Sequence, residues 1–325
     1  MRRLLLMLLA LLALCALALM RGQLALSPLQ LWQGLSGAEG PAHLVLAVIR
    51  GPRVAAALGT GAALGLSGML FQTLFRNPLA APDLMGFTSG AGLAIVLAMT
   101  LGLGLPVPLV AALGGLIAAA LVLLLAWKPG QALAPLVLVL VGLGVGFLTQ
   151  AASSFLMTAL PPEQAADAQR WLTGSLNARN WGHVALLAAG LAVLGLLALS
   201  QIRRLEALDL GEELAAGLGL HPGRARIAIA VTGVLLAALA VSVAGPLPFV
   251  ALMAGPLGAR LLGRTALAPR MAAAALTGAM IVVAADLLAR ATIPGLSLPA
   301  GVVTGLLGAP YLLWRLSREM KKGEL

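Results

Sequence analysis

The sequence is poor in charged and aromatic residues for its length. Of its 325 residues, 10% are charged and 4% are aromatic, whereas 61% are apolar. A soluble domain of this size needs a far more charged surface, so the composition excludes a water-soluble globular protein. About ten membrane helices of roughly 20 residues each would leave only short loops and termini. We therefore expect an all-α polytopic membrane protein, organised as a single transmembrane domain over residues 1–325.

Residues that carry out covalent chemistry are also scarce. The single cysteine, Cys15, lies inside an apolar run and excludes a disulfide framework. No lysine follows a glycine, so the chain has no Walker A phosphate-binding loop. The histidines His43, His183 and His221 are scattered and belong to no H-E-x-x-H motif. We expect no catalytic residue, no metal site and no cofactor on this chain.

Positive charge exceeds negative charge, and its position matters more than its amount. A net charge of +10 is common in nucleic-acid-binding proteins, but here the basic residues separate apolar runs and indicate membrane topology instead. We expect no nucleic-acid partner. The predicted spans are 4–20, 54–75, 84–105, 107–127, 131–160, 182–200, 227–245, 248–262, 271–290 and 300–316. If both termini are cytoplasmic, most basic residues lie inside, and the outer side carries only Arg21, Arg50, Arg53, Arg170, Arg179 and Arg290.

Two of the apolar stretches have ends that hydropathy alone does not define. Residues 4–20 follow two arginines like the apolar core of a signal peptide, but no small-x-small cleavage site comes after them, so we expect an uncleaved first helix. Residues 227–262 would span about 54 Å as one helix, against a bilayer core of about 30 Å. We expect the sequence Gly245-Pro246-Leu247-Pro248 to divide this stretch into two short segments.

Two connecting segments are longer than simple turns. The outer segment 161–181 mixes acidic, basic and aromatic residues and predicts a short interfacial helix. The inner segment 201–226 carries Leu210, Leu214 and Leu218 at intervals of four residues, amid acidic residues. This spacing predicts a short amphipathic helix on the cytoplasmic face.

Two motifs inside the apolar runs have both a functional and a structural interpretation. The G-L-S-G sequence at residues 65–68 matches the surroundings of an intramembrane serine-protease nucleophile, but no later apolar run holds a histidine to act as its base. We interpret Gly61 and Gly65 as a G-x-x-x-G helix-packing motif. Asp286 is an acid inside an apolar run, four residues before Arg290, so the two lie on one helix face. We favour a structural ion pair over a proton-relay carboxylate.

The arginines at the outer ends of the spans also allow two interpretations. Arg50 and Arg53 lie at the outer end of the second predicted span, and Arg290 lies at the outer end of the ninth. They are either interfacial side chains that reach the headgroups or a basic patch that docks an acidic extracytoplasmic partner.

Motifs along the whole chain, in a fixed order, resemble one transporter family. They are Arg50-Gly51-Pro52-Arg53; Arg76-Asn77-Pro78-Leu79-Ala80-Ala81-Pro82, followed by Gly86 and Ser89-Gly90-Ala91; Trp171-Leu172-Thr173-Gly174-Ser175; Leu210-Gly211-Glu212 through Leu220; and Asp286, Arg290, Pro299, Gly301 and Gly308-Ala309-Pro310. These motifs resemble the FecCD-type permease subunits of type II ABC importers for iron–siderophore complexes, haem and cobalamin. The chain departs from the family pattern at Leu257, where members commonly carry a histidine, and at Gly51, where they carry leucine.

The resemblance implies a transport subunit rather than an enzyme. It implies a second permease chain, identical or different, two ATP-binding subunits that hold ATP and magnesium, and an extracytoplasmic substrate-binding protein. The assembly would lie in the cytoplasmic (inner) membrane of a bacterium or archaeon. The expected substrate is a metal chelate, first a ferric siderophore, with haem and cobalamin as alternatives. An ion-gradient-driven secondary transporter is the alternative from another class, and it predicts paired intramembrane acids and an internal repeat.

The resemblance also implies roles for particular residues. Arg50, Arg53 and Arg290 would dock the binding protein, and Asn77 and Leu79 would form the cytoplasmic gate. The segment that couples to the ATPase would comprise Leu210, Gly211, Glu212, Ala215, Leu218, Gly219 and Leu220. The fifth span would line the path through Gln150, Ser154, Met157 and Thr158, which share one helix face by their spacing.

Overall fold

The computed structural model describes residues 2–22, 25–37, 40–127, 135–263, 266–291 and 298–322. Within these ranges the chain forms helices and no strands, as expected. The apolar helices coincide with the predicted spans: α1 Arg2–Met20, α4 Gly51–Leu74, α5 Phe87–Thr100, α6 Val107–Ala126, α7 Pro135–Met157, α9 Trp181–Ser200, α12 Pro222–Ala244, α13 Val250–Leu262, α14 Leu267–Ala291 and α15 Ala300–Lys322. Residues 131–134 of the predicted fifth span lie outside the described residues.

Seven of the described helices are long and apolar enough to cross a membrane. The longest extends α4 backwards through α3 (Pro41–Leu44) and the π-helix η1 (Val45–Arg50), so that it covers Pro41–Leu74. Helices α5 and α13 have 14 and 13 residues, about 20 Å each, which is less than a bilayer core of about 30 Å. The structure therefore supports a polytopic membrane protein, while the count of ten spans stays a prediction.

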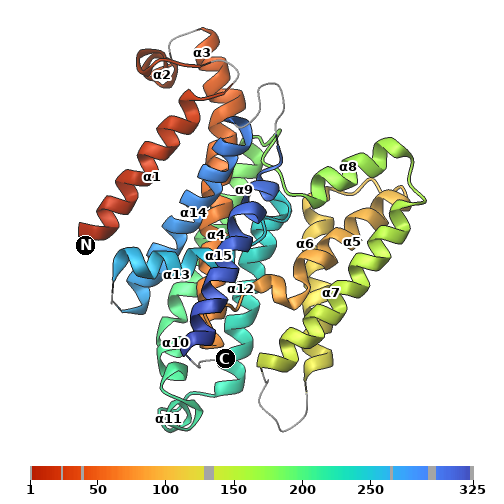
Figure 1. Cartoon of the computed structure of the whole chain (residues 1–325), viewed down its shortest axis with the longest axis vertical. Coiled ribbons are helices and arrows are strands. Elements are labelled where there is room, and N and C mark those ends of the chain that lie inside the picture. Colours follow the sequence, from red (N-terminus) through yellow and green to blue (C-terminus); the bar gives the residue numbers. More distant parts are fainter. Residues whose placement is uncertain are drawn as a thin grey trace.

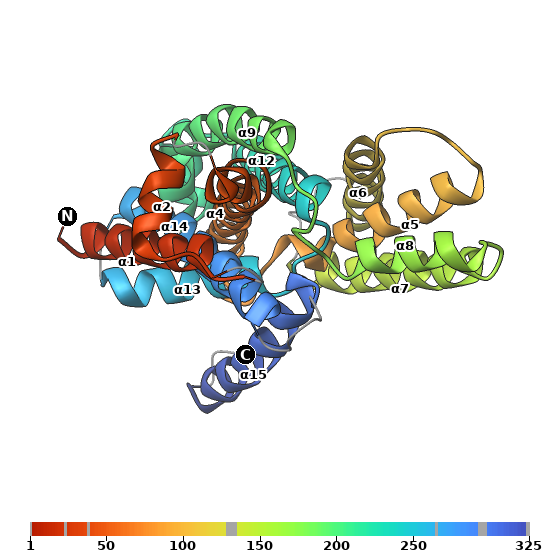
Figure 2. The ribbon, with the colours of Figure 1, turned by 90° about the horizontal axis from the view of Figure 1, so that it is seen from above.

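Helix α4 is the centre of the larger group of helices. It packs against α9, α12, α13 and α14, with α1 outside α14, whereas α5, α6 and α7 form a second group beside α12 (Figures 1 and 2). The contact between α4 and α14 is close because a Cβ atom added at Gly61 or Gly65 would overlap the α14 backbone. The structure thus bears out the G-x-x-x-G packing motif. Ser67 is fully buried and donates to the Gly233 carbonyl oxygen at 2.6 Å, which ties α4 to α12.

The break in the stretch 227–262 falls where the sequence predicts it. Helix α12 ends at Ala244, Gly245 has a φ of 69°, and α13 begins at Val250. The expectation of two short segments was wrong for the first of them, because α12 has 23 residues and begins at Pro222. Proline suits a first helical turn, so the helix starts before the apolar run does.

The inner segment 201–226 does not form one amphipathic helix. It forms α10 (Ile202–Asp209) and α11 (Glu212–Gly217), separated at Gly211, whose φ of 114° interrupts the helical backbone. Leu210 and Leu218 lie on either side of α11 and are not part of that helix. The prediction that leucines spaced four residues apart share one helical face was therefore wrong. At the opposite end of the molecule, the outer segment forms the predicted short helix, α8 (Pro162–Leu172) (Figure 1).

Candidate functional site

The end of the molecule that the sequence predicts to be outer contains a buried cluster of charged side chains that joins α4 to α14. Arg53 forms a bidentate contact with Asp286: its Nε lies 2.9 and 3.0 Å from the two carboxylate oxygens, and its Nη2 lies 2.7 Å from Oδ1. Arg290, one turn further along α14, lies 3.2 Å from the other side of the same carboxylate. Asp286 is 1% exposed. Two guanidinium groups therefore compensate one buried carboxylate, as burial of a charge requires.

The same cluster holds the outer end of α1. Arg50 is 5% exposed and donates to the Leu19 and Met20 carbonyl oxygens at 2.7 and 3.2 Å. Arg290 donates to the Ala18 carbonyl oxygen at 3.3 Å. The last carbonyl groups of a helix lack partners within the helix and carry a partial negative charge. The arginines thus cap α1, and their side chains contact the chain itself rather than extending freely outward.

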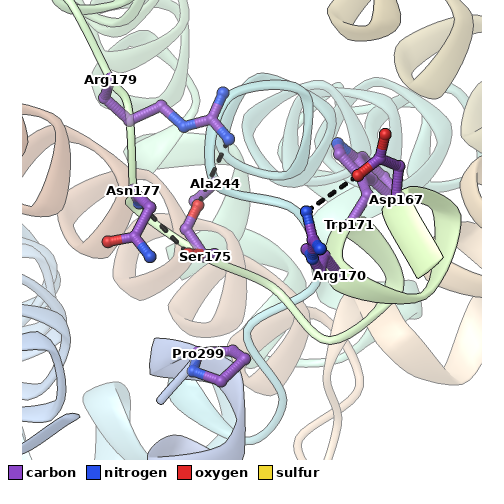
Figure 3. A pocket seen from close by; sticks show the side chains of 8 residues that line it. All are labelled: Asp167, Arg170, Trp171, Ser175, Asn177, Arg179, Ala244 and Pro299. Atoms are coloured by element: carbon purple, nitrogen blue, oxygen red, sulfur yellow. Dashed lines mark hydrogen bonds and ion pairs between the residues drawn. The ribbon is translucent and has the colours of Figure 1, made fainter. Parts of the chain in front are cut away.

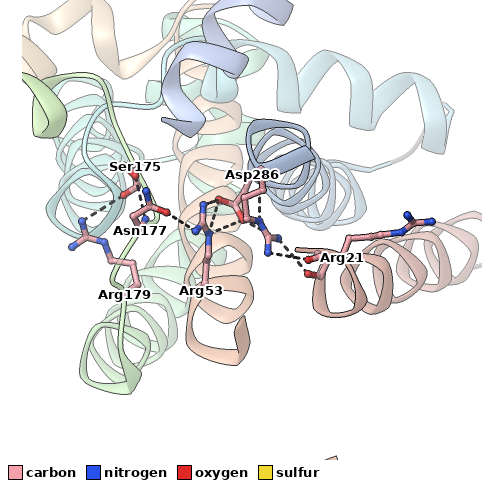
Figure 4. A network of polar contacts seen from close by, with 8 residues as sticks. Arg21, Arg53, Ser175, Asn177, Arg179 and Asp286 are labelled. Carbon is pink, nitrogen blue, oxygen red and sulfur yellow. Dashed lines mark hydrogen bonds and ion pairs between the residues drawn. The ribbon is translucent and has the colours of Figure 1, made fainter. Parts of the chain in front are cut away.

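The cluster continues into the loop between α8 and α9. Asn177 accepts a hydrogen bond from Arg53, its backbone N–H donates to the Ser175 hydroxyl, and Arg179 donates to the Ser175 carbonyl oxygen (Figure 4). The sequence identifies Arg179 only as an outer basic residue and indicates no role for Asn177, because the contacts of both residues depend on how this loop folds. Beside the loop lies a pocket of about 580 Å³ bounded by α8 and the end of α12 (Figure 3).

At the opposite end, which the sequence predicts to be the inner one, the loop after α4 contacts the α10–α11 segment. Arg76 has a φ of 50°, and its guanidinium donates to the Leu208 carbonyl oxygen and lies 3.6 Å from Asp209. The Asn77 side chain accepts from the Leu79 N–H at 2.8 Å, which stabilises the turn that follows Arg76. Asn77 is exposed and Leu79 is half-buried. The two predicted gate residues therefore lie on a turn that is directly tied to α10.

The predicted coupling segment presents an apolar surface to the exterior. Leu210, Leu214 and Leu218 are 62%, 61% and 70% exposed, while Ala215 is fully buried. Gly219 has a φ of 80°, and its turn leads through the half-buried Leu220 to α12. The Glu212 side chain lies outside the described residues. Three exposed leucines on a segment of this size form an apolar surface patch.

The predicted path residues are only partly on one face. Gln150 and Ser154 are exposed on α7, and Met157 is half-buried at its last turn. Thr158 lies beyond the end of α7 and donates to the Phe155 carbonyl oxygen at 2.7 Å, so it is not part of the helical face. Hydroxyl side chains favour turns of this kind at helix ends. The spacing of the four predicted path residues did not reveal that the helix ends before Thr158.

Comparison with known proteins settles the family. The model of the FecCD transport family matches residues 8–318. The chain belongs to the FecCD transport family. Among similar members, the ferric enterobactin transport system permease protein of Escherichia coli K12 is 37% identical, with 99% of this chain and 98% of the relative covered. The hemin transport system permease protein of Yersinia pestis is 34% identical over 93% of this chain and 91% of the relative.

The fold of this FecCD chain is also found among solved structures. An inward-facing structure of a metal-chelate type ABC transporter superposes with a TM-score of 0.82 at 27% identity, covering 97% of this chain and 98% of the other. The family match and this superposition both extend over nearly the whole chain. The resemblance identified from the sequence motifs is therefore confirmed.

Proposed function

We propose that this chain is the permease subunit of an ABC importer that passes a metal chelate, first a ferric siderophore, from a binding protein to the cytoplasm. The observation that carries the proposal is its similarity over nearly the whole chain to a metal-chelate type transporter. Haem is the second candidate substrate, because a hemin transport permease is among the similar relatives, and cobalamin is the third. A second permease chain and two subunits that bind ATP and magnesium complete the assembly in the cytoplasmic membrane.

The outer arginine cluster is the proposed docking site for the binding protein. Arg53 and Arg290 supply two positive charges against the carboxylate of Asp286, and Arg50 lies near Arg290. The cluster is thus net positive, and it attracts carboxylates on an approaching protein. Asp286 holds two of these guanidinium groups in fixed positions, so docking does not have to order long side chains first.

The inner end provides the proposed connection to ATP hydrolysis. The exposed leucines of the α10–α11 segment form the surface that the ATP-binding subunit covers. Arg76 connects α10 to the turn that carries Asn77 and Leu79. A displacement of the α10–α11 segment therefore reaches the proposed gate through one side chain, without a long chain of intermediates.

The proposed path follows the exposed side of α7. Gln150, Ser154 and Met157 provide weakly polar, uncharged groups there, which lets a large chelate pass without a tight binding step. No ion pair of the described residues lies on this part of α7. Because the second permease chain would face this surface, the path would form between the two chains.

Uptake by proteoliposomes tests the proposal. The chain is reconstituted with the ATPase and binding protein encoded beside it, and labelled ferric siderophore, haem and cobalamin are offered in parallel. The proposal predicts that one of the three ligands accumulates in the vesicles. This accumulation should require ATP on the side of the membrane where the ATPase lies. Uptake driven by a proton or sodium gradient without any ATPase contradicts it, and would make Asp286 the residue to examine as a proton carrier.

A further inference from the structure

The outer pocket has a lining that suits one chemical class of ligand. It lies where α8, the loop before α9, the end of α12 and the residue before α15 meet (Figure 3). Its volume of about 580 Å³ falls in the range of small-molecule sites. The lining residues that could contact a ligand are Arg170, Trp171, Ser175, Asn177 and Arg179.

Arg179 brings an uncompensated positive charge to this pocket. Its Nε is buried and has no hydrogen-bond partner, and its Nη2 makes only a long contact of 3.5 Å with the Ser175 carbonyl oxygen. Within the described residues, Arg179 forms no ion pair. The preceding residue, Ala178, has a φ of 55°, a backbone conformation that is costly for alanine and that fixes the direction of the next side chain.

The other charged residues of the pocket compensate each other. Arg170 lies 2.9 Å from Asp167, one turn away on α8, so the lining carries one net positive charge, that of Arg179. Burial also lowers the pKa of Arg179 from its ordinary value, since the charged form is poorly solvated there. An anionic group that enters the pocket would relieve this cost and could accept hydrogen bonds from the Nη groups of Arg179.

Asn177 and Trp171 determine which other chemical groups a ligand of this pocket needs. The Asn177 Oδ1 accepts from Arg53, which leaves its amide N–H groups as donors at the pocket. Trp171 is half-buried in the wall and offers an apolar aromatic surface. The pocket therefore matches a ligand with oxygen acceptors, negative charge and a flat or apolar portion.

We propose that this pocket is an entry subsite that receives an anionic catecholate or carboxylate group of the metal chelate, with Arg179 and Asn177 holding its oxygens. The proposal rests on the proposed transport function and narrows its substrate class. Fe³⁺ bound by three catecholates, each a dianion, is negatively charged, whereas Fe³⁺ bound by three hydroxamates, each a monoanion, is neutral. Because Asn177 also contacts Arg53, the subsite adjoins the proposed docking cluster, where a binding protein would release its ligand.

Equilibrium binding tests the subsite apart from transport. The permease–ATPase complex in nanodiscs, without binding protein or ATP, is titrated with ⁵⁵Fe-labelled ferric tris-catecholate and with ferric tris-hydroxamate. We expect the anionic chelate to bind more tightly. Arg179→Gln should weaken it about tenfold or more, as expected for loss of a hydrogen bond to a charged group, while Arg179→Lys should retain part of the affinity. Arg21→Gln is the matched control, because Arg21 carries the same charge at the outer end and its side chain points away from the cluster (Figure 4).

Binding-protein affinity and ATP-driven uptake are measured on the same variants. Three results overturn the subsite: no preference for the anionic chelate, equal weakening of both chelates by Arg179→Gln, or weaker docking of ligand-free binding protein with unchanged chelate affinity. The last result would assign the pocket to the docking surface instead. If the wild-type complex shows no ATP-driven uptake, the proposed function fails. If uptake proceeds and Arg179→Gln binds the anionic chelate as the wild type does, only the subsite fails.

Discussion

Replacement of Asp286 by asparagine should be among the most destabilising conservative changes in this chain. The substitution preserves the shape of the side chain and removes the negative charge between Arg53 and Arg290. Asp286 is 1% exposed and accepts three contacts within 3.0 Å from Arg53 alone. Loss of one partner from a buried ion pair costs about 3–5 kcal/mol, because the remaining charges stay buried without compensation. We expect a loss of that size in the free energy of unfolding.

The assay is reversible unfolding of the purified chain in mixed micelles, titrated with dodecyl sulfate and followed by tryptophan fluorescence. Asp167→Asn is the matched control: Asp167 also pairs with an arginine, at 2.9 Å, but both side chains are more than half exposed. An exposed pair of this kind contributes about 0–1 kcal/mol. If Asp286→Asn lowers the free energy of unfolding no more than Asp167→Asn does, the charged cluster does not hold α4 against α14.

Three further changes test other parts of the structure. Arg50→Gln should reduce the stimulation of ATPase activity by the binding protein several-fold, whereas Arg21→Gln should not, and equal effects would remove Arg50 from the docking site. Gly61→Val should abolish the yield of folded protein, because the new side chain overlaps the α14 backbone. Gly144 faces open space, so Gly144→Val should express normally. Comparable yields of the two variants in size-exclusion chromatography would show that α4 and α14 do not need glycine at position 61. Arg76→Gln should lower the number of chelates imported per ATP while ATP hydrolysis continues, and an unchanged ratio would show that α10 does not act through this contact.

The elements that the sequence predicts best are those set by local composition. The apolar runs became helices at nearly the predicted positions, because a long apolar segment in a bilayer must satisfy its own backbone groups. The break before α13 was predictable from Gly245 and two prolines for the same local reason. The pair of Asp286 with Arg290 was also predictable, since it needs only a four-residue spacing on one helix.

The features that were missed depend on tertiary contacts. Arg53 and Asp286 are 233 residues apart, and their pairing follows from the close approach of α4 and α14 rather than from any local pattern. The interruption at Gly211 was missed because a leucine repeat does not reveal a residue with positive φ. The pocket beside Arg179 depends on the conformation of the loop between α8 and α9. The sequence of this loop has no hydrophobic periodicity from which that conformation could be predicted.

The capping of α1 has a consequence for how the protein is made. Helix α1 is synthesised long before α14, yet its outer end is held by Arg290, which follows Ala18 by 272 residues. At about 5–20 residues per second, ribosomes need roughly 15–55 s to reach that arginine. During this interval Arg50, 31 residues after Leu19, is already available to hold the end of the helix. Helix α1 should therefore complete the contacts at its outer end only when α14 arrives, so that a late step in assembly of the bundle joins two segments that enter the membrane far apart in time.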